Sequence, residues 1–185
     1  CGAWMTGEVD PSLPVCAGCR ASLVPIADPR CPGCGMPLLV EHGRCTRCRA
    51  AEYAFSSATA AFAYRGLARD LVIAMKSGRR RRLARLFAPH LAGILAARLP
   101  GLAVVPVPPR PGRGRSDAVE LLARELERRH GVRVLRLLRR APGAAQKSLS
   151  YEQRLRNLAG RLRLRRRACP VGALVVLDDV FTTGA

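Results

Sequence analysis

The sequence predicts an α/β fold in which helices flank a parallel sheet, with a small cysteine-rich module at the N-terminus. Residues 102–107 and 132–138 are apolar segments on either side of a helical pattern at about 117–130, which is the order of a β-α-β unit. Residues 174–177 form another apolar segment, of the kind found in strands buried on both faces. Seven of the eight cysteines lie in residues 1–48, which sets that part of the chain apart.

Length, charge and hydrophobicity limit the classes of protein to which this chain can belong. The chain has 185 residues, enough for one domain of ordinary size and a small module, here predicted at 51–185 and 1–50. No apolar run reaches the roughly 20 residues of a membrane span, and no signal peptide pattern is present. We therefore expect a cytoplasmic protein without membrane insertion. The net charge of +19 fits an anionic partner such as nucleic acid, and equally the arginine-rich composition of a GC-rich genome.

The N-terminal cysteines occur in pairs separated by two residues. A Cys-x-x-Cys turn directs two thiolates at one tetrahedral metal ion, and two such turns complete a structural zinc site. Disulfides or redox thiols are the alternative, but disulfides need an oxidising compartment and nothing in the sequence indicates export. The ligands predicted for a first, complete zinc site are Cys31, Cys34, Cys45 and Cys48.

A second zinc site is predicted from the remaining N-terminal cysteines. Cys1, followed by a glycine, is similar to the end of a further Cys-x-x-Cys turn, so Cys1, Cys16 and Cys19 would be three of its four ligands. A crossed pairing of the turns would use the same residues, and His42 is favoured as a surface histidine over a substitute ligand. Because protein would fill every ligand position, the module has a structural or binding role.

Two strands or one, then two helices, are expected between the module and the sheet. Apolar residues alternate with Ser and Thr in residues 50–64, which predicts the strands. Residues 66–76 form a helical pattern that ends at Lys76. A second helix, at about 82–99, contains Pro89, which we expect to kink or break it. The arginines at 79–82 are interpreted as a solvated surface in preference to a phosphate contact.

The predicted strand 102–107 leads into a loop rich in glycine and arginine. Glycine gives room, and arginine gives charge-assisted hydrogen bonds, so a loop of this composition could approach a pyrophosphate closely. Ser116 or Asp117 can cap the next helix, which ends at Gly131. After the strand at 132–138, a capping box predicts a short helix at 150–158, and alternating residues predict a strand at 161–166 with one solvated face.

Two adjacent carboxylates, Asp178 and Asp179, follow the last apolar segment. Placing them together costs desolvation and repulsion, which ribose hydroxyls or a metal ion can offset. Thr182, Thr183 and Gly184 come next, and such a turn offers N–H groups and hydroxyls to a phosphate. Because the chain has no initial methionine and stops inside this turn, we expect a fragment cut at both ends.

The eleven residues 175–185 resemble the PRPP-binding signature of type I phosphoribosyltransferases. The whole layout resembles the ComF family, whose members join an N-terminal double zinc ribbon to a phosphoribosyltransferase-like domain and are associated with DNA uptake in natural competence. The loop departs from the family pattern at residues 115–117, while Arg113 and Gly114 are kept. Other positions that match the family are Val105, Pro106, Val107, Pro108, Gln146, Leu149, Arg154, Asn157 and Lys76.

The resemblance implies a type I phosphoribosyltransferase-like sheet and a PRPP site. Asp178 and Asp179 would bind the ribose hydroxyls of PRPP, directly or through Mg²⁺, and residues 182–185 (Thr182, Thr183, Gly184 and Ala185) would hold the 5′-phosphate. Arg113 and Gly114 would lie near the pyrophosphate. Pentosyl transfer is the implied reaction, but no residue has the character of a dedicated general base, so catalysis itself is left open.

A second interpretation gives the chain no catalytic role. In it, the zinc ribbon and the arginine patches bind single-stranded DNA, or the ribbon docks a helicase-like, DNA-translocating partner of the competence system. The scarcity of aromatic residues for base stacking argues against the DNA version.

Overall fold

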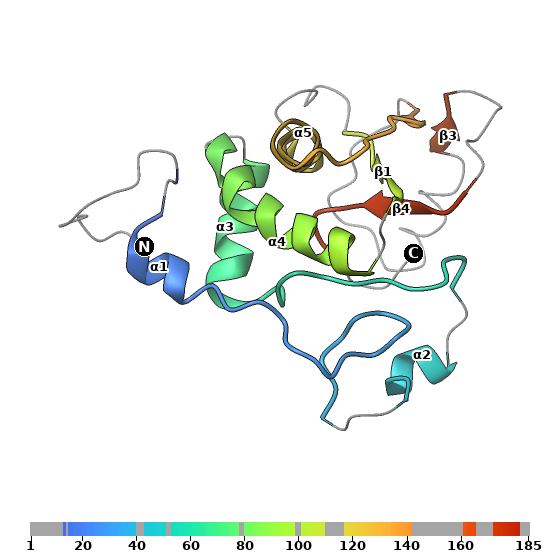
Figure 1. The fold of residues 1–185 in the computed structure, drawn as a ribbon, viewed down its shortest axis with the longest axis horizontal. Coiled ribbons are helices and arrows are strands. Elements are labelled where there is room, and N and C mark those ends of the chain that lie inside the picture. The colour runs from blue at the N-terminus through green and yellow to red at the C-terminus, as the bar shows by residue number, and fades with distance from the viewer. Residues whose placement is uncertain are drawn as a thin grey trace.

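The structure is a computed structural model that describes residues 13, 15–39, 43–50, 53–77, 80–98, 101–109, 117–141, 161–165 and 172–181. It is a mixed α/β fold with a small parallel sheet, as predicted. Figure 1 shows the larger helices gathered beside the central strand pair, with the cysteine-rich segment around α2 below them. The elements are α1 (Ala17–Ala21), α2 (Thr46–Ala50), α3 (Gly66–Lys76), η1 (Arg81–Leu83), α4 (Ala84–Arg98), β1 (Ala103–Pro106), α5 (Ala118–His130), β2 (Leu138–Arg140), β3 (Leu162–Leu164) and β4 (Leu174–Leu177).

Strand β1 has parallel neighbours on both sides. On one side it pairs with β4, with Val104 opposite Val175. On the other side Val104 forms a parallel bridge with Val134, and the N–H of Leu135 donates to the carbonyl of Val104 at 2.8 Å. The β-α-β unit predicted around α5 is therefore confirmed. The predicted strand at 132–138 is shorter than expected, since it is reduced to this bridge before the chain turns into β2, which pairs antiparallel with β3.

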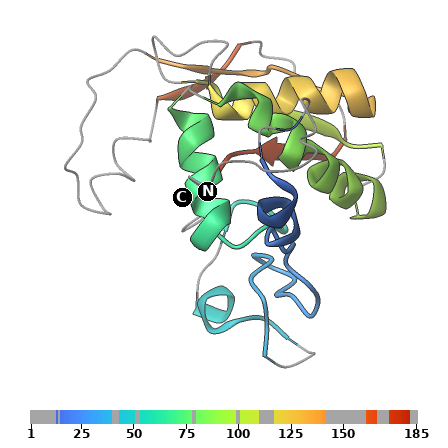
Figure 2. The ribbon, with the colours of Figure 1, turned by 90° about the vertical axis from the view of Figure 1, so that its left-hand side faces the viewer.

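Helices α4 and α5 cover the sheet and enclose the core. The sequence positions α5: the Asp117 carboxylate accepts a hydrogen bond from the N–H of Val119 at 3.0 Å, and Gly131 ends the helix with φ of +63°. Figure 2 shows α5 lying alongside the strands at the end of the molecule opposite α2. The most fully buried residues of this core are Met75, Leu83, Ala84, Ala88, Val104, Ala123 and Leu126.

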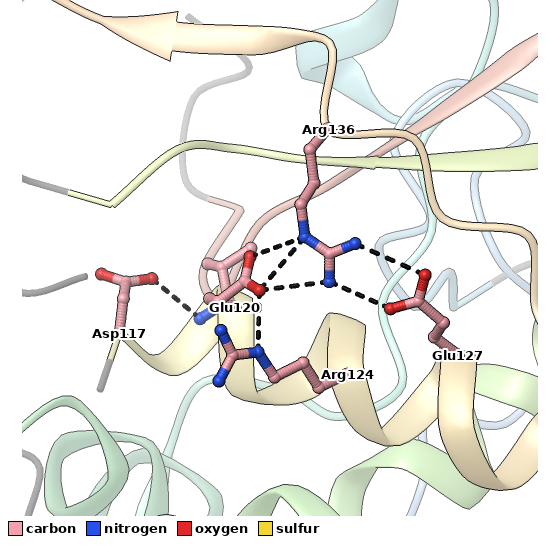
Figure 3. A network of polar contacts seen from close by, with 6 residues as sticks. Asp117, Glu120, Arg124, Glu127 and Arg136 are labelled. Atoms are coloured by element: carbon pink, nitrogen blue, oxygen red, sulfur yellow. Dashed lines mark hydrogen bonds and ion pairs between the residues drawn. The ribbon is translucent and has the colours of Figure 1, made fainter. Parts of the chain in front are cut away.

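A network of ion pairs fixes the chain that leaves α5 (Figure 3). The guanidinium of Arg136 lies 3.1 Å from a carboxylate oxygen of Glu120 and 3.1 Å from one of Glu127, both on α5. Arg124 also contacts Glu120, at 2.9 Å. A guanidinium shared between two carboxylates holds the segment between α5 and β2 against the helix.

One sequence prediction about regular structure is wrong, and of the kink or break expected at Pro89 the break does not occur. No strand forms in the described residues 53–65, because this segment's backbone bonds to the cysteine-rich module instead of to a neighbouring strand: the N–H of Ala58 donates to the carbonyl of Gly33. Pro89 does not break α4, which runs through it. Pro89 lies on the exposed side, where water can bind the carbonyl left without an N–H partner, while Phe87 and Ala88 stay buried.

The expectation that the last strand is buried on both faces is also wrong. Leu177 of β4 is buried, but Val176 is 63% exposed. Val175 packs against the core and Val176 points to the other face, as alternation along a strand requires. The strand predicted at 161–166 is present as β3, whereas the predicted helix at 150–158 and the family-like positions Gln146, Leu149, Arg154 and Asn157 lie outside the described residues.

Candidate metal centre and acidic-pair site

Four cysteines form a cluster of thiol groups in the N-terminal module. The Sγ atoms of Cys31, Cys34, Cys45 and Cys48 all lie within 4.8 Å of one another. The Sγ atoms of Cys34 and Cys45 are 3.6 Å apart. A tetrahedral zinc ion with Zn–S bonds of about 2.3 Å separates its sulfurs by about 3.8 Å, so the cluster fits zinc well.

Short turns bring the four thiols together. The N–H of Gly35 donates to the carbonyl of Cys31 at 2.8 Å, closing the first turn. Cys48 comes from α2, and Cys45 precedes that helix with its N–H donating to the Sγ of Cys31 at 3.3 Å. A Cβ at Gly33 would lie 3.0 Å from the Sγ of Cys48, so this glycine leaves the space that the sulfur needs. The Cys-x-x-Cys spacing of the sequence therefore brings the four ligands together in the fold.

The pKa values of the thiols diverge. Burial acts to raise the pKa of Cys31, but N–H groups of Cys45, Cys34 and Gly33 together lower it to about 6. Burial first, and the surrounding thiols next, raise the pKa of Cys48 to about 12. Burial also raises the pKa of Cys34. The protein by itself stabilises the thiolate of Cys31 and opposes those of Cys34 and Cys48, so a divalent cation is the partner that would allow the cluster to ionise fully.

The described residues give one complete metal site, and it is the one that the sequence predicted. Cys31, Cys34, Cys45 and Cys48 could hold zinc, and the described cysteines are not joined in disulfides. Of the second predicted site, Cys16 and Cys19 form a turn at the start of α1, where the N–H of Cys19 donates to the Sγ of Cys16 at 3.4 Å and lowers the pKa of that thiol. Cys1 and His42 lie outside the described residues.

The acidic pair lies where the two parallel strands β1 and β4 end. Asp178 and Asp179 follow β4 directly, and the N–H of Val107, just past β1, donates to the carbonyl of Leu177 at 2.9 Å. The N–H of Asp179 donates to the Asp178 carboxylate at 2.8 Å. Lys76, at the end of α3, places its Nζ 2.9 Å from an oxygen of Asp179.

Burial and the neighbouring charges act in opposite directions on the pKa of the Asp178 carboxyl. Loss of water is the largest effect and raises the pKa of the Asp178 carboxyl above its ordinary value. The negative charge of Asp179 also raises this pKa. The hydrogen bond from the Asp179 N–H and the positive charges of Lys76 and Arg140 lower it, but not enough to cancel the rise. Arg140 reaches this end of the sheet from β2, donating from Nε to the carbonyl of Pro108 at 3.3 Å. No sequence signal marks Arg140 for this place, because nothing in its local pattern shows that β2 ends beside the loop after β1.

The remaining predicted ligand-binding residues are not placed. Arg113, Gly114, Thr182, Thr183, Gly184 and Ala185 lie outside the described residues. Phe181, which precedes them, is described and makes an edge-to-face contact with Phe55, with ring centroids 5.9 Å apart. Phe55 stacks on Tyr53 at 4.8 Å, and Tyr53 packs against the cysteine cluster. A row of aromatic rings therefore joins the metal cluster to the segment after the acidic pair.

Comparisons of the chain with protein-family models, with curated proteins and with solved structures gave no match. Across the part of the chain that the structure describes, no helix combines the length and the apolar character that crossing a membrane requires.

Replacing Cys48 by Ser is expected to remove about one equivalent of zinc per chain. Loss of one thiolate opens the four-ligand site, and metal-free ribbons of this kind lose most of their folding energy. Zinc content measured by atomic emission after gel filtration checks this, with Cys169→Ser as the control that keeps the N-terminal cysteines intact. Full zinc content in Cys48→Ser would exclude the proposed ligand set.

Replacing Gly35 by Ala is expected to destabilise the zinc-loaded protein by about 2–4 kcal/mol. Gly35 has φ of +69°, and an added Cβ would lie 2.7 Å from the Cα of Thr59. Gly18→Ala is the matched control, since Gly18 lies in α1 with open space around it. Urea denaturation followed by circular dichroism compares the two variants, and equal stability would contradict the tight contact between the module and residues 58–60.

Proposed function

We propose that this chain is a ComF-like member of the phosphoribosyltransferase family that binds PRPP at the acidic pair and takes part in DNA uptake. Asp178 and Asp179 would accept hydrogen bonds from the ribose hydroxyls, and Thr182, Thr183, Gly184 and Ala185 would bind the 5′-phosphate. Arg113 and Gly114 would lie near the pyrophosphate. The zinc ribbon is the structural module of the same protein.

The observation that carries this proposal is the place of the acidic pair at the carboxyl ends of two paired parallel strands. In open α/β sheets ligands bind just beyond that edge. Asp178 and Asp179 follow β4 directly, and the loop that follows β1 starts beside them. Lys76 and Arg140 add positive charge at this edge, which suits a ligand that carries phosphates next to its hydroxyls.

Any chemistry at such a site would be displacement of pyrophosphate from the anomeric carbon by an acceptor. The bond from that carbon to the pyrophosphate oxygen breaks, the acceptor bond forms, and positive charge develops on the sugar in between. The protein would position the sugar and stabilise charge, with carboxylates near the developing cation and arginines on the leaving pyrophosphate. The acceptor and the existence of turnover are separate questions from binding.

Calorimetric titration of Mg²⁺·PRPP into the zinc-loaded protein tests the site. We expect saturable binding to the unaltered chain and at least about a hundredfold loss when Asp178 and Asp179 are both replaced by Asn, because two charge-assisted hydrogen bonds to ribose become neutral ones. Asp70→Asn is the matched control: it removes a carboxylate from an exposed position on α3. Absence of heat with all three proteins would refute the proposal.

A second candidate function is binding of single-stranded DNA, and one observation favours it. In the β2–β3 pair Arg139 lies directly opposite Arg163, both exposed. Directly opposite residues place their side chains on the same face of two strands, so a phosphate lying over this face could contact both guanidinium groups. Arg161 and Arg165 lie directly before and after β3, so the β2–β3 pair carries a dense positive surface.

If the β2–β3 pair binds DNA, replacing both Arg139 and Arg163 by Glu reverses two charges. This double change should weaken binding of a labelled oligothymidylate by about tenfold or more and make that binding less dependent on salt concentration. Fluorescence anisotropy over a salt series measures both quantities. The control pair Arg69→Glu and Arg128→Glu makes the same change in net charge on helices α3 and α5. If both double variants lose the same affinity for the oligothymidylate, the loss is explained by net charge alone, and the β2–β3 pair is not a DNA-binding site.

A further inference from the structure

Lys76 occupies a fixed position beside the acidic pair. It is the last residue of α3, and the helix is anchored in the core by Val72 and Met75. Its ammonium lies 2.9 Å from Asp179, whose side chain is 17% exposed, while the Lys76 side chain is 40% exposed. A partly enclosed ion pair of this kind keeps more of its Coulomb attraction than one on the open surface, because less water screens the two charges.

The two carboxylates of the pair differ in their partners. Within the described part of the chain, every carboxylate except those of Asp117 and Asp178 lies within ion-pair distance of an arginine or lysine. Asp117 caps α5. Asp178 accepts from the N–H of Asp179 at one oxygen and has no ion pair with any residue that the structure describes, although the chain carries a net charge of +19. Of the two carboxylates, Asp178 therefore keeps more accepting capacity for a ligand, while Asp179 shares one oxygen with Lys76.

We propose that Lys76 is a specificity-determining residue of the acidic pair: as the resident counter-cation of Asp179, it leaves Asp178 to accept from a neutral diol and keeps a divalent cation off the pair. The identity of that diol as ribose rests on the proposed function. The ammonium supplies the positive charge that a metal ion would otherwise bring to two adjacent carboxylates.

The pair as the structure places it does not fit a divalent cation. A magnesium or manganese ion bridging both carboxylates would have to bind Asp179 beside an ammonium that already lies 2.9 Å from one of its oxygens, and the two cations would repel each other. With Lys76 present the net charge of the three side chains is −1, which attracts a dication far less than −2 does. A hydroxyl has no such conflict, because it donates to Asp178 without adding charge.

Binding of Mn²⁺ alone tests the role of Lys76. The zinc-loaded full chain is titrated with Mn²⁺, and the electron paramagnetic resonance signal of the free ion gives the bound fraction. Lys76→Met is expected to bind Mn²⁺ at least about tenfold more tightly than the unaltered chain, because the pair regains its full negative charge. Lys76→Arg should keep the weak binding, and Lys76→Met combined with Asp179→Asn should lose the gain.

The matched control is Arg69→Met, which removes one positive charge from the same helix beside Asp70. It should leave Mn²⁺ binding unchanged. Equal Mn²⁺ affinity in Lys76→Met and the unaltered chain, or an equal gain in Arg69→Met, would overturn the inference. Zinc content and thermal unfolding of each variant establish that it is folded, and Lys76→Gln is the replacement if the Met variant unfolds.

Calorimetry with ribose 5-phosphate separates this inference from the proposed function. With the unaltered chain, affinity should be the same with and without Mg²⁺. With Lys76→Met, affinity should fall several-fold without Mg²⁺ and recover when Mg²⁺ is added. A strong dependence on Mg²⁺ in the unaltered chain would overturn the role of Lys76. No binding of ribose 5-phosphate to the unaltered chain would count against the proposed function, while the Mn²⁺ comparison would still decide about Lys76.

Discussion

The parallel pairing of β1 with β4 is the constraint on which the arrangement of the acidic-pair site depends. It joins segments that are far apart in the chain, Ala103–Pro106 and Leu174–Leu177, and such pairing must overcome the entropy of closing a long loop. Burial supplies the compensation: Val104 and Leu177 belong to one core with residues of α3, α4 and α5. Once the two strands are aligned, both of their carboxyl ends meet at the same edge, and the ends of α3 and β2 come to it as well.

The large positive charge of the chain shapes which carboxylates are available. Glu120 and Glu127 are held by Arg136, so the negative groups of α5 serve to attach the next segment. Asp179 is held by Lys76 in the same way. A chain with few acids among many bases tends to neutralise each acid with its own residues, and a carboxylate left over, such as Asp178, keeps accepting capacity for a ligand.

The sequence predicted what depends on local pattern and missed what depends on distant contacts. Helix α5 could be predicted with its cap and its terminal glycine, because those signals lie within a few residues of its ends. The cysteine cluster followed from ligand spacing for the same reason. The strands expected at residues 50–64 did not form, since Ala58 bonds to Gly33 of the module. Arg140 and Lys76 reach the acidic pair through tertiary packing, which no local period encodes.

Residues 53–62 connect the two parts of the molecule physically. Gly35 lies against Thr59, so the metal-binding turn closes onto this segment. The ring of Phe55 in the same segment contacts Phe181, which follows the acidic pair. A module this small has too little apolar surface to hold its shape alone, which is why metal ligation and contact with the larger core have to act together. The irregular backbone of the segment follows from this, because Ala58 bonds to Gly33 of the module while Phe62 packs against the larger core.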